Sequence, residues 1–296
     1  MISVLICSSN PVLLEQVQTN IVNTIGTKYE ILYFDNREMN KGICAVYNEL
    51  ASKAQFPYLC FLHEDVLFEN QGWGNKIVEI FSSDPGIGLI GVAGSKYKSA
   101  YFSGWFSNMK ELDCANYVHQ YKTGIERVHL SPGDNYLLEE VVCIDGVFMC
   151  SKKEAWETNK FNEDLLTGFH FYDIDLSLRI AHHYKVVVTY DVLLKHITSG
   201  GDYGNKWVEI AMKYHQQMRS QLPFSKIKVE YKIADRKVIE AALDFLKKYN
   251  ISFSNKIKWV TLQKLYLSRI YYYSILKFLF YKPLGLKYIH NLFRTK

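Results

Sequence analysis

The stretch Tyr58-Leu-Cys-Phe-Leu-His63-Glu64-Asp65-Val66 is a run of apolar residues that ends abruptly in one imidazole and two carboxylates. An apolar run of this length, after a helical pattern, predicts a strand covered on both faces of a parallel sheet. Ligands of open α/β sheets bind at the carboxyl ends of such strands. Carboxylates there lose hydration energy unless a cation or hydrogen bonds compensate them. A lone Asp would indicate a polar turn, whereas the His-Glu-Asp group predicts a functional site.

The residues before this stretch predict two strands and two helices. We expect strands at Ile2–Cys7 and Tyr29–Phe34, and helices from Pro11 to about Ile25 and from Gly42 to Lys53. Strands that alternate with helices in this way predict right-handed crossovers and a parallel sheet. Polar residues also follow these two strands, so the strand ends should form one rim of a crevice: Ser8, Ser9, Asp35 and Asn36.

The following residues predict a helix at Gly72–Phe81 and a glycine-punctuated strand at Gly88–Gly94. Between Ser95 and Glu140 the hydrophobic periodicity breaks down, which predicts a long loop of functional importance. The aromatic residues between Tyr97 and Phe106 argue against disorder in this loop.

Regular patterns return at Val141–Cys150, a predicted strand that Asp145 and Gly146 interrupt. After a short helix at Lys152–Thr158, the next helical pattern places Asp173 at a helix start, where the helix dipole favours a carboxylate. Asp173 and Asp175 are candidate bases, and the alternative is that they cap the helix and pair with Arg179. Strands are expected at Val186–Thr189 and Leu193–His196, the latter ending near Gly200-Gly201.

The chain of 296 residues is 48% hydrophobic, which suffices for one large domain or for a domain with an appendage. The six cysteines form no CxxC pair, and Cys7 and Cys60 lie in predicted buried strands. This pattern favours reduced thiols over a disulfide framework or a zinc site. The first residues lack the basic region and cleavage site of a signal peptide, so we expect a cytoplasmic protein.

The net charge of +5 is unevenly spread. Residues 251–296 contain nine Lys and Arg and no acidic residue, whereas residues 1–250 carry a net charge of −4. The basic residues alternate with aromatic and aliphatic ones, but the longest uncharged run, Ile270–Leu276, is far shorter than the roughly 20 residues of a spanning helix. The segment favours an interfacial helix on an anionic membrane leaflet over a helix packed on the body, a dimer contact or a nucleic-acid contact.

Asp65 and His196, with a contribution from His63 or Glu64, would suit a divalent cation such as Mn²⁺ or Mg²⁺. The alternative for His196 is a hydrogen-bonded histidine at a strand end. The sequence contains no GxGxxG motif, P-loop or GxSxG motif, so dehydrogenases, P-loop kinases and α/β hydrolases are poorly supported.

The order of these motifs over about residues 2–200 resembles that of bacterial family 2-like glycosyltransferases, in particular a glycosyltransferase-like group whose strand end reads His-Asp-Asp or similar. The resemblance implies a GT-A-type α/β fold with a mostly parallel central sheet flanked by helices. It implies a catalytic domain at 1–225, with a nucleotide-sugar-binding half at 1–95 and an acceptor-binding half at 96–225. Residues 226–296 would form a helical, basic, aromatic C-terminal extension.

The resemblance also implies roles for residues that match the family's motifs. Asp35 would contact the nucleotide base, Asp65 would be the metal-binding last carboxylate of a DxD-type motif, and His196 would be a further metal ligand. Asp173 would be the general base, with Asp175 as its alternative. Two positions depart from the family pattern, because His63 replaces the first Asp of DxD and Tyr172 replaces the Glu that precedes the base. The remaining candidates are Ser8, Ser9, Asn10, Asn36, Gly42, Asn48, His63 and Glu64 for the donor, and Trp105, Asp145 and Gly146 for the acceptor.

The function so implied is that of a metal-dependent hexosyltransferase, which moves a sugar from a nucleotide-diphosphate-sugar, expected to be a UDP-sugar, to a hydroxyl of a bacterial surface glycan or a lipid-linked acceptor. Inversion at the anomeric carbon is expected, as is a peripheral position on the inner face of the cell membrane through residues 256–296. Aromatic residues at 97–106 would stack on acceptor sugars or form a locally packed loop. The alternatives are an inactive glycosyltransferase-like binding module and a nucleotidyltransferase, although the site region lacks the Lys/Arg cluster that the latter requires.

Overall fold

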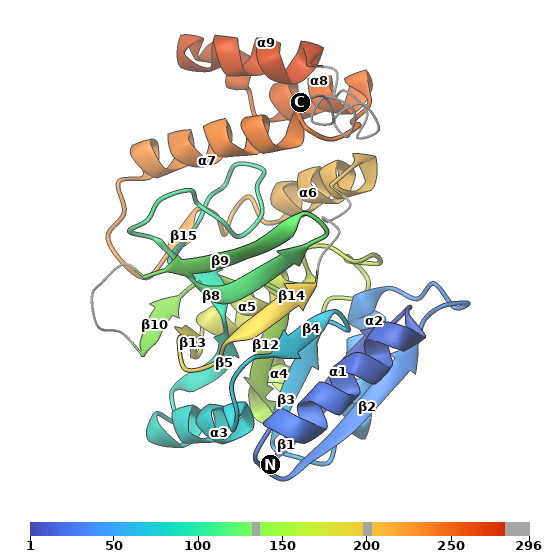
Figure 1. The fold of residues 1–296 in the computed structure, drawn as a ribbon. Coiled ribbons are helices and arrows are strands. Elements are labelled where there is room, and N and C mark those ends of the chain that lie inside the picture. Colours follow the sequence, from blue (N-terminus) through green and yellow to red (C-terminus); the bar gives the residue numbers. More distant parts are fainter. Residues whose placement is uncertain (132–136, 198–202, 282–296) are drawn as a thin grey trace, which may run out of the picture.

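Strand β3 (Tyr58–Leu62) lies inside a seven-stranded sheet in a computed structural model that describes residues 1–131, 137–197 and 203–281 (Figure 1). The strand order is β10-β13-β5-β12-β3-β1-β2. This arrangement, with helices on both faces, confirms the expected α/β class. The other strands of the sheet are β1 (Ile2–Ser8), β2 (Tyr29–Asp35), β5 (Ile87–Gly91), β10 (Leu138–Val141), β12 (Phe148–Lys152) and β13 (Lys185–Thr189).

The central sheet is mixed, so the expectation of a mostly parallel sheet is corrected. Strand β1 pairs in parallel with β2 and β3, and β13 pairs in parallel with β5. Strand β12 runs antiparallel to both β3 and β5, and β10 runs antiparallel to β13. A strand buried on both faces has the same apolar composition in either direction, so the hydrophobic pattern could not reveal that β12 is reversed.

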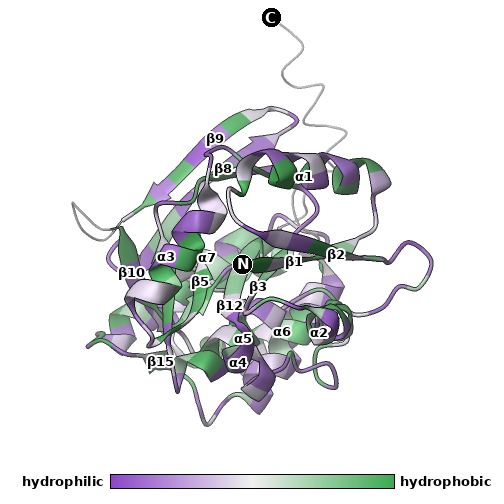
Figure 2. Cartoon of the chain, turned by 90° about the horizontal axis from the view of Figure 1, so that it is seen from below, coloured by the Kyte–Doolittle hydropathy of each residue, from purple (hydrophilic) through white to green (hydrophobic). Residues whose placement is uncertain are grey.

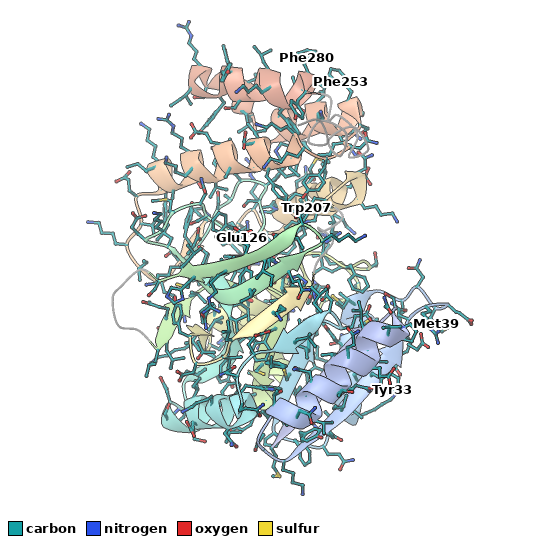
Figure 3. The ribbon with its side chains drawn as sticks, in the orientation of Figure 1. Tyr33, Met39, Glu126, Trp207, Phe253 and Phe280 are labelled. Atoms are coloured by element: carbon teal, nitrogen blue, oxygen red, sulfur yellow. The ribbon has the colours of Figure 1, made fainter. Side chains whose placement is uncertain are left out.

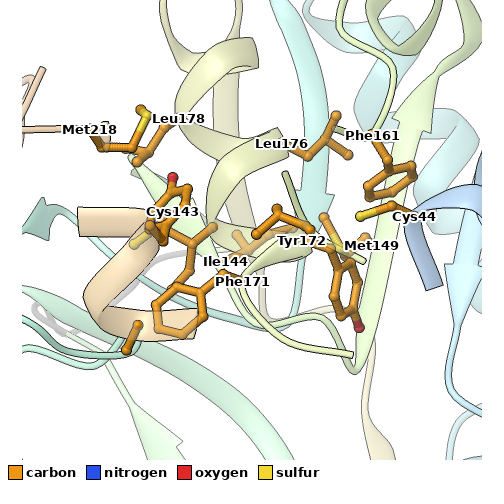
Figure 4. Close-up of a cluster of buried hydrophobic side chains, with 14 of the residues drawn as sticks. Cys44, Cys143, Ile144, Met149, Phe161, Phe171, Tyr172, Leu176, Leu178 and Met218 are labelled. Atoms are coloured by element: carbon orange, nitrogen blue, oxygen red, sulfur yellow. The ribbon is translucent and has the colours of Figure 1, made fainter. Parts of the chain in front are cut away.

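Two apolar cores form on the two faces of the sheet, because alternate residues of each buried strand point to opposite sides. In β3, Cys60 and Leu62 belong to the core under α1 and α3, whereas Leu59 and Phe61 belong to the core under α2, α4 and α5. Figure 2 shows these two groups of helices on opposite sides of the strands, with β1 strongly hydrophobic, and Figure 4 shows part of the second core. The helices are α1 (Pro11–Thr24), α2 (Ile43–Lys53), α3 (Trp73–Ser83), α4 (Lys153–Thr158) and α5 (Tyr172–Ala181).

All six cysteines are free and buried, among them Cys7 and Cys60 in strands β1 and β3 as expected. Most of the expected helices and strands occur within two residues of their predicted bounds. Helix α1, for example, begins where Asn10 accepts hydrogen bonds from the backbone N–H groups of Val12 and Leu13, with Pro11 at the first helical position.

The prediction of a long loop between Ser95 and Glu140 was wrong for much of this segment. It contains a hairpin of β8 (Asp113–Tyr121) and β9 (Gly124–Leu130), which belongs to a second sheet with the order β11-β6-β8-β14-β4. Strand β9 lies on the outside of β8 and is largely exposed, so it has no apolar run to mark it in the sequence. The remaining strands of this sheet are β4 (Val66–Phe68), β6 (Ala93–Ser95), β11 (Cys143–Ile144) and β14 (Leu194–Ile197).

The C-terminal part of the described chain is helical, and α7, α8 and α9 gather at one end of the molecule beyond the β8–β9 hairpin (Figure 1). None of the helices in residues 1–131, 137–197 and 203–281 is long and apolar enough to cross a membrane. The division of the chain at residues 95 and 225 stays a prediction, and residues 282–296 of the expected extension, like Gly200 and Gly201, lie outside the described residues. The helices are α6 (Asn205–Gln217), α7 (Tyr231–Leu246), α8 (Phe253–Leu262) and α9 (Tyr272–Phe280), with 3-10 turns η1 (Leu265–Leu267) and η2 (Arg269–Tyr271).

A buried polar cluster connects residues 97–103 to α6. Lys98 is 1% exposed, and its ammonium group donates hydrogen bonds to the Ser103 hydroxyl and to Nε2 of His215, each at 2.8 Å. The His215 ring donates its Nδ1–H to the carbonyl of Ala211, which leaves Nε2 as the acceptor. Two short strands, β7 (Tyr97–Lys98) and β15 (Phe224–Ser225), pair beside this cluster.

Lys98 should make stability depend on pH in a defined direction. Burial lowers its pKa to about 7, whereas a lysine of the unfolded chain keeps its proton to about pH 10. Between these values the unfolded state binds more protons, so the free energy of unfolding rises with pH by up to about 1.4 kcal/mol per unit. Urea unfolding of wild type and Lys98→Met at pH 7, 8 and 9 should show wild type gaining stability relative to the variant.

The exposed Lys122 is a matched control, since Lys122→Met should give a difference from wild type that does not change with pH. A pH-independent difference for Lys98→Met as well would contradict the prediction.

Candidate functional site

The ends of β1, β2 and β3 meet at one rim, as the sequence predicted. In the parallel register, Ser8 lies opposite Asp35 and Ile6 opposite Leu62, immediately before His63. Glu64 turns toward the start of α1, where its carboxylate accepts hydrogen bonds from the Ser8 hydroxyl and from the backbone N–H groups of Ser9 and Asn10. Glu64 is thus fully engaged with the turn between β1 and α1.

The residues after β2 form a short closed loop. Asn36 donates to the carbonyl and accepts from the N–H of Lys41, both at 2.8 Å. The neighbouring Asp35 is half-exposed and pairs with Arg37, whose hydrogen bonds lower the pKa of the carboxyl group. Asp35 therefore lies at the rim with its carboxylate accessible.

Gly42 and Asn48 contact the segment that precedes α5. A Cβ at Gly42 would lie 2.4 Å from the carbonyl oxygen of Thr167, so the glycine permits close packing there. The Asn48 side chain accepts from the N–H and donates to the carbonyl of Phe161. These contacts hold α2 against residues 161–167.

Three side chains converge beyond β3. His63, Asp65 and His196 each offer one donor atom, and these atoms lie within 4.8 Å of one another. His196 arrives from β14, which pairs with β4 so that His196 lies opposite Val66. The Nε2 atom of His196 is 3.2 Å from Oδ2 of Asp65, and Nδ1 of His63 is 3.9 Å from Oδ1 of the same carboxylate. All three side chains are largely buried.

Tyr172 fixes the protonation of His63. The Tyr172 hydroxyl donates its single proton to the carbonyl of Gly146, at 3.1 Å, and lies 2.7 Å from Nε2 of His63. We assign the ring hydrogen of His63 to Nε2, because a hydroxyl that donates to the Gly146 carbonyl accepts from the imidazole, and Nδ1 then presents a lone pair toward Asp65. A Cβ at Gly146 would come within 2.1 Å of this hydroxyl, so only glycine allows the contact.

The arrangement fits a divalent cation. Among the described residues, Oδ1 of Asp65 is buried without a hydrogen-bond partner, and the lone pair of His63 faces it. Two electron-rich atoms facing each other repel unless a proton or a cation lies between them, and imidazole with carboxylate is a donor set that transition-metal ions accept. The second ring nitrogen of His63 is held by Tyr172, as is usual for metal-binding histidines.

Protonation of the cluster without a cation follows from the same contacts. Burial lowers the pKa of His63, which keeps it a neutral ligand. Burial opposes ionisation of both Asp65 and His196, but their hydrogen bond prevails and lowers the pKa of Asp65 while it raises that of His196. A cation would take the place of the His196 proton, so acid should weaken its binding.

The two carboxylates of α5 point in different directions, since they lie about 200° apart around the helix. Asp173 accepts hydrogen bonds from the backbone N–H groups of Gly146 and Ile174, and burial together with nearby Asp145 raises its pKa to about 7. Asp175 is 2% exposed and accepts two hydrogen bonds from Arg179, at 2.7 and 2.9 Å. Asp173 is the carboxylate that remains available for proton transfer near neutral pH.

Asp145 lies near Asp173, and Trp105 bonds to Asp145. The Trp105 indole N–H donates to Asp145 at 2.6 Å, and the second oxygen of Asp145 accepts from the N–H of Val147. Of the other aromatic residues of this segment, Tyr97 and Phe102 are almost fully buried, so the packed-loop alternative holds for these two.

In the sequence, Tyr172 stands out only as a departure from a family motif, which does not predict the role of its hydroxyl. The position of Tyr172 next to Asp173 was a signal, but its contacts with His63 and Gly146 span 109 and 26 residues of the chain and follow from the fold alone.

Comparison with known proteins gives one match in sequence. Residues 3–230 match the sequence model of the "Glycosyltransferase like family". None of the curated proteins matches the chain.

Several solved structures are similar at low identity. GalNAc-T7 with UDP, GalNAc and Mn²⁺ shares 12% identity over 80% of this chain at a TM-score of 0.49, and the chain spans only 54% of that protein. The mannosyltransferase PcManGT from Pyrobaculum calidifontis, in complex with GDP-Man and Mn²⁺, shares 12% identity over 100% of this chain and 88% of that one, also at 0.49. TarS of S. aureus shares 10% identity over 83% of this chain and 43% of that one, at 0.45.

The Tyr172–His63 hydrogen bond should control metal affinity. Tyr172→Phe removes the acceptor of the His63 ring hydrogen, and loss of such a supporting contact weakens metal binding by about 10- to 100-fold. Calorimetric titration of wild type and variant with Mn²⁺ at pH 7.5 measures the difference.

Tyr190→Phe is the control, because the Tyr190 hydroxyl bonds the carbonyl of Leu130 away from the cluster. An unchanged Mn²⁺ affinity in Tyr172→Phe, with the fold intact, would show that the hydroxyl does not orient His63.

Proposed function

Because the chain belongs to the glycosyltransferase-like family, we propose that it transfers a sugar from a nucleoside-diphosphate-sugar to a hydroxyl group, with inversion at the anomeric carbon. A UDP-sugar is the proposed donor, and a bacterial surface glycan or a lipid-linked glycan is the proposed acceptor. The observation that carries the proposal is the convergence of His63, Asp65 and His196 at the rim that Ser8 and Asp35 also reach. A cation centre beside a strand-end rim suits a ligand that carries a diphosphate.

His63, Asp65 and His196 would hold the cation, Mn²⁺ or Mg²⁺, through one imidazole nitrogen each and the carboxylate. The cation would supply positive charge for the diphosphate that leaves the donor sugar. Asp35, accessible at the end of β2, is the proposed partner of the nucleotide base. Glu64 acts indirectly, because it fixes the turn of Ser8, Ser9 and Asn10 against the rim.

Asp173 is the proposed general base. Its carboxylate takes the proton of the acceptor hydroxyl as that oxygen bonds to the anomeric carbon, while the bond from this carbon to the diphosphate breaks. A base is most effective when its pKa lies near the working pH, and the pKa of about 7 meets this condition. Asp175 is the weaker candidate, because Arg179 holds its buried carboxylate.

Trp105 and Asp145 are proposed to contact the acceptor. Asp145 lies near Asp173, and its hydrogen bond with Trp105 orients the indole plane. A planar apolar ring next to a carboxylate suits a sugar, whose faces are apolar and whose edges carry hydroxyl groups.

We further propose that the C-terminal helices rest on an anionic membrane surface. Residues 253–281 carry large apolar side chains that are 37–69% exposed, and the segment has exposed Lys and Arg but no acidic residue. Phe253 and Phe280 point outward at the end of the molecule in Figure 3. The exposed apolar residues are Phe253, Ile257, Leu262, Tyr266, Leu267, Ile270, Tyr272, Tyr273, Leu276, Phe280 and Tyr281.

The transferase proposal predicts that Asp173→Asn keeps donor binding but loses turnover. A thermal-shift screen of UDP- and GDP-sugars with Mn²⁺ should find a donor that stabilises wild type, by about 2.7 kcal/mol at 100 times its dissociation constant. Asp173→Asn should keep this shift but lose about 100- to 10,000-fold in turnover of that donor. The wild-type rate should rise with pH through about 7, since Asp173 acts in its deprotonated form.

Two variants sharpen the test. Asp65→Ala should abolish the metal-dependent shift, and Asp175→Asn should unfold at a lower temperature while it keeps the wild-type pH profile. Donor binding without turnover in wild type would favour an inactive binding module. A donor-induced thermal shift that is the same with and without metal would contradict the cation site.

The membrane proposal predicts charge-dependent vesicle binding. Wild type should sediment with vesicles that contain phosphatidylglycerol and much less with pure phosphatidylcholine. Reversal of the exposed Lys258, Arg269 and Lys277 to Glu should weaken binding by at least about 100-fold, since each basic residue near such a surface contributes about 1 kcal/mol.

Reversal of Lys28, Lys122 and Lys232, outside this segment, is the matched control and should weaken binding much less. Equal binding to both vesicle types would exclude the anionic surface.

A further inference from the structure

A polar row crosses the second sheet and ends at the metal-binding cluster. On β8, His119 lies opposite His196 of β14 on one side and opposite Glu126 of β9 on the other. Residues directly opposite each other in a ladder point to the same face of the sheet. His119 therefore shares a face with His196, and Figure 3 shows Glu126 on the outer strand of this hairpin.

His119 approaches the cluster without joining it. The ring centroids of His119 and His196 are 5.4 Å apart, but His119 is not one of the three residues whose donor atoms lie within 4.8 Å of one another. A group bound to a cation in the cluster would lie within reach of the His119 ring. His119 thus lies next to the cluster without belonging to it.

The orientation of the His119 ring is fixed by its neighbours. Tyr117 packs edge-to-face against it at 4.7 Å, and Tyr121 lies at 5.2 Å, both two residues away on the same face of β8. Among the described residues, Nδ1 of His119 is buried and has no hydrogen-bond partner. A buried polar atom without a partner is unfavourable by about 1–3 kcal/mol, so a bound ligand that satisfies it gains affinity.

We propose that His119 binds the diphosphate of the nucleotide donor, with Nδ1–H donating a hydrogen bond to a phosphate oxygen. The inference rests on the proposed function, because it assigns a partner to the same donor site. A phosphate oxygen is an anionic acceptor. Of the carboxylates nearby, Asp65 and Asp145 are engaged by His196 and Trp105, and Glu126 makes no hydrogen bond to Nδ1 of His119. The hydrogen bond strengthens as the diphosphate gains charge on leaving, so His119 contributes to binding and to turnover.

The test is calorimetric titration with UDP and GDP at saturating Mn²⁺, after separate titration with Mn²⁺ alone. His119→Ala should weaken nucleotide binding by about 10- to 100-fold, the range for a hydrogen bond to a charged group, and leave the Mn²⁺ affinity unchanged. His119→Asn should restore most of the affinity, because the Asn amide nitrogen lies near the position of Nδ1. His119→Gln places its amide near Nε2 and should not restore it.

His129→Ala is the control for the hairpin, because His129 lies on β9 opposite Asn116, away from the cluster. Unchanged nucleotide affinity in His119→Ala, a parallel loss of Mn²⁺ affinity, or equal losses in His119→Asn and His119→Gln would each overturn the inference. A wild-type protein that binds Mn²⁺ but neither nucleotide would overturn the proposed function and this inference together. Wild-type nucleotide affinity in His119→Ala would overturn the inference alone and leave the proposed function standing.

Discussion

The hydrogen bond between Tyr172 and His63 is the contact on which the site depends. Its direction is set by the carbonyl of Gly146, which takes the only proton of the hydroxyl. His63 is therefore left with its lone pair facing a carboxylate oxygen that lacks a partner among the described residues. A neutral histidine held in this tautomer offers a lone pair to a metal ion, whereas the opposite tautomer would direct its Nδ1–H toward Asp65 and leave no ligand atom there.

The mixed sheet is what brings these groups together. Strand β12 runs antiparallel to β3, so the Asp145-Gly146 turn that precedes it lies at the carboxyl end of β3. The same turn supplies the carbonyl for Tyr172 and a backbone N–H for Asp173. Gly146 has no side chain, so α5 can approach closely enough for both contacts. One reversed strand thus joins the metal cluster and the proposed base.

The sequence predicted the parts of this architecture that rest on local pattern. The buried strand at Tyr58–Leu62, its polar end, the first three strand–helix units and the helix start at Asp173 all carry local signals of periodicity or capping. The direction of β12 carried no such signal, because an apolar run has the same composition in a parallel and in an antiparallel strand. The β8–β9 hairpin carried none either, because β9 is an exposed outer strand without an apolar run. His119 was missed for the same reason, since a histidine in a supposed loop has no defined neighbours.

Three carboxylates lie near one another, and their surroundings separate their roles. Asp65 is paired with His196, which lowers its pKa and keeps it ionised as a ligand should be. Asp145 receives hydrogen bonds from Trp105 and Val147, which occupy both of its oxygens. The carboxylate of Asp173 accepts hydrogen bonds from two backbone N–H groups, and burial together with the nearby charge of Asp145 raises its pKa to about 7. When their surroundings give neighbouring carboxyl groups different pKa values, the group with the lower pKa stays ionised and the group with the higher pKa can exchange protons. On this argument Asp173 is the base, and Asp175, held by Arg179 in the helix packing, stabilises the element that positions it.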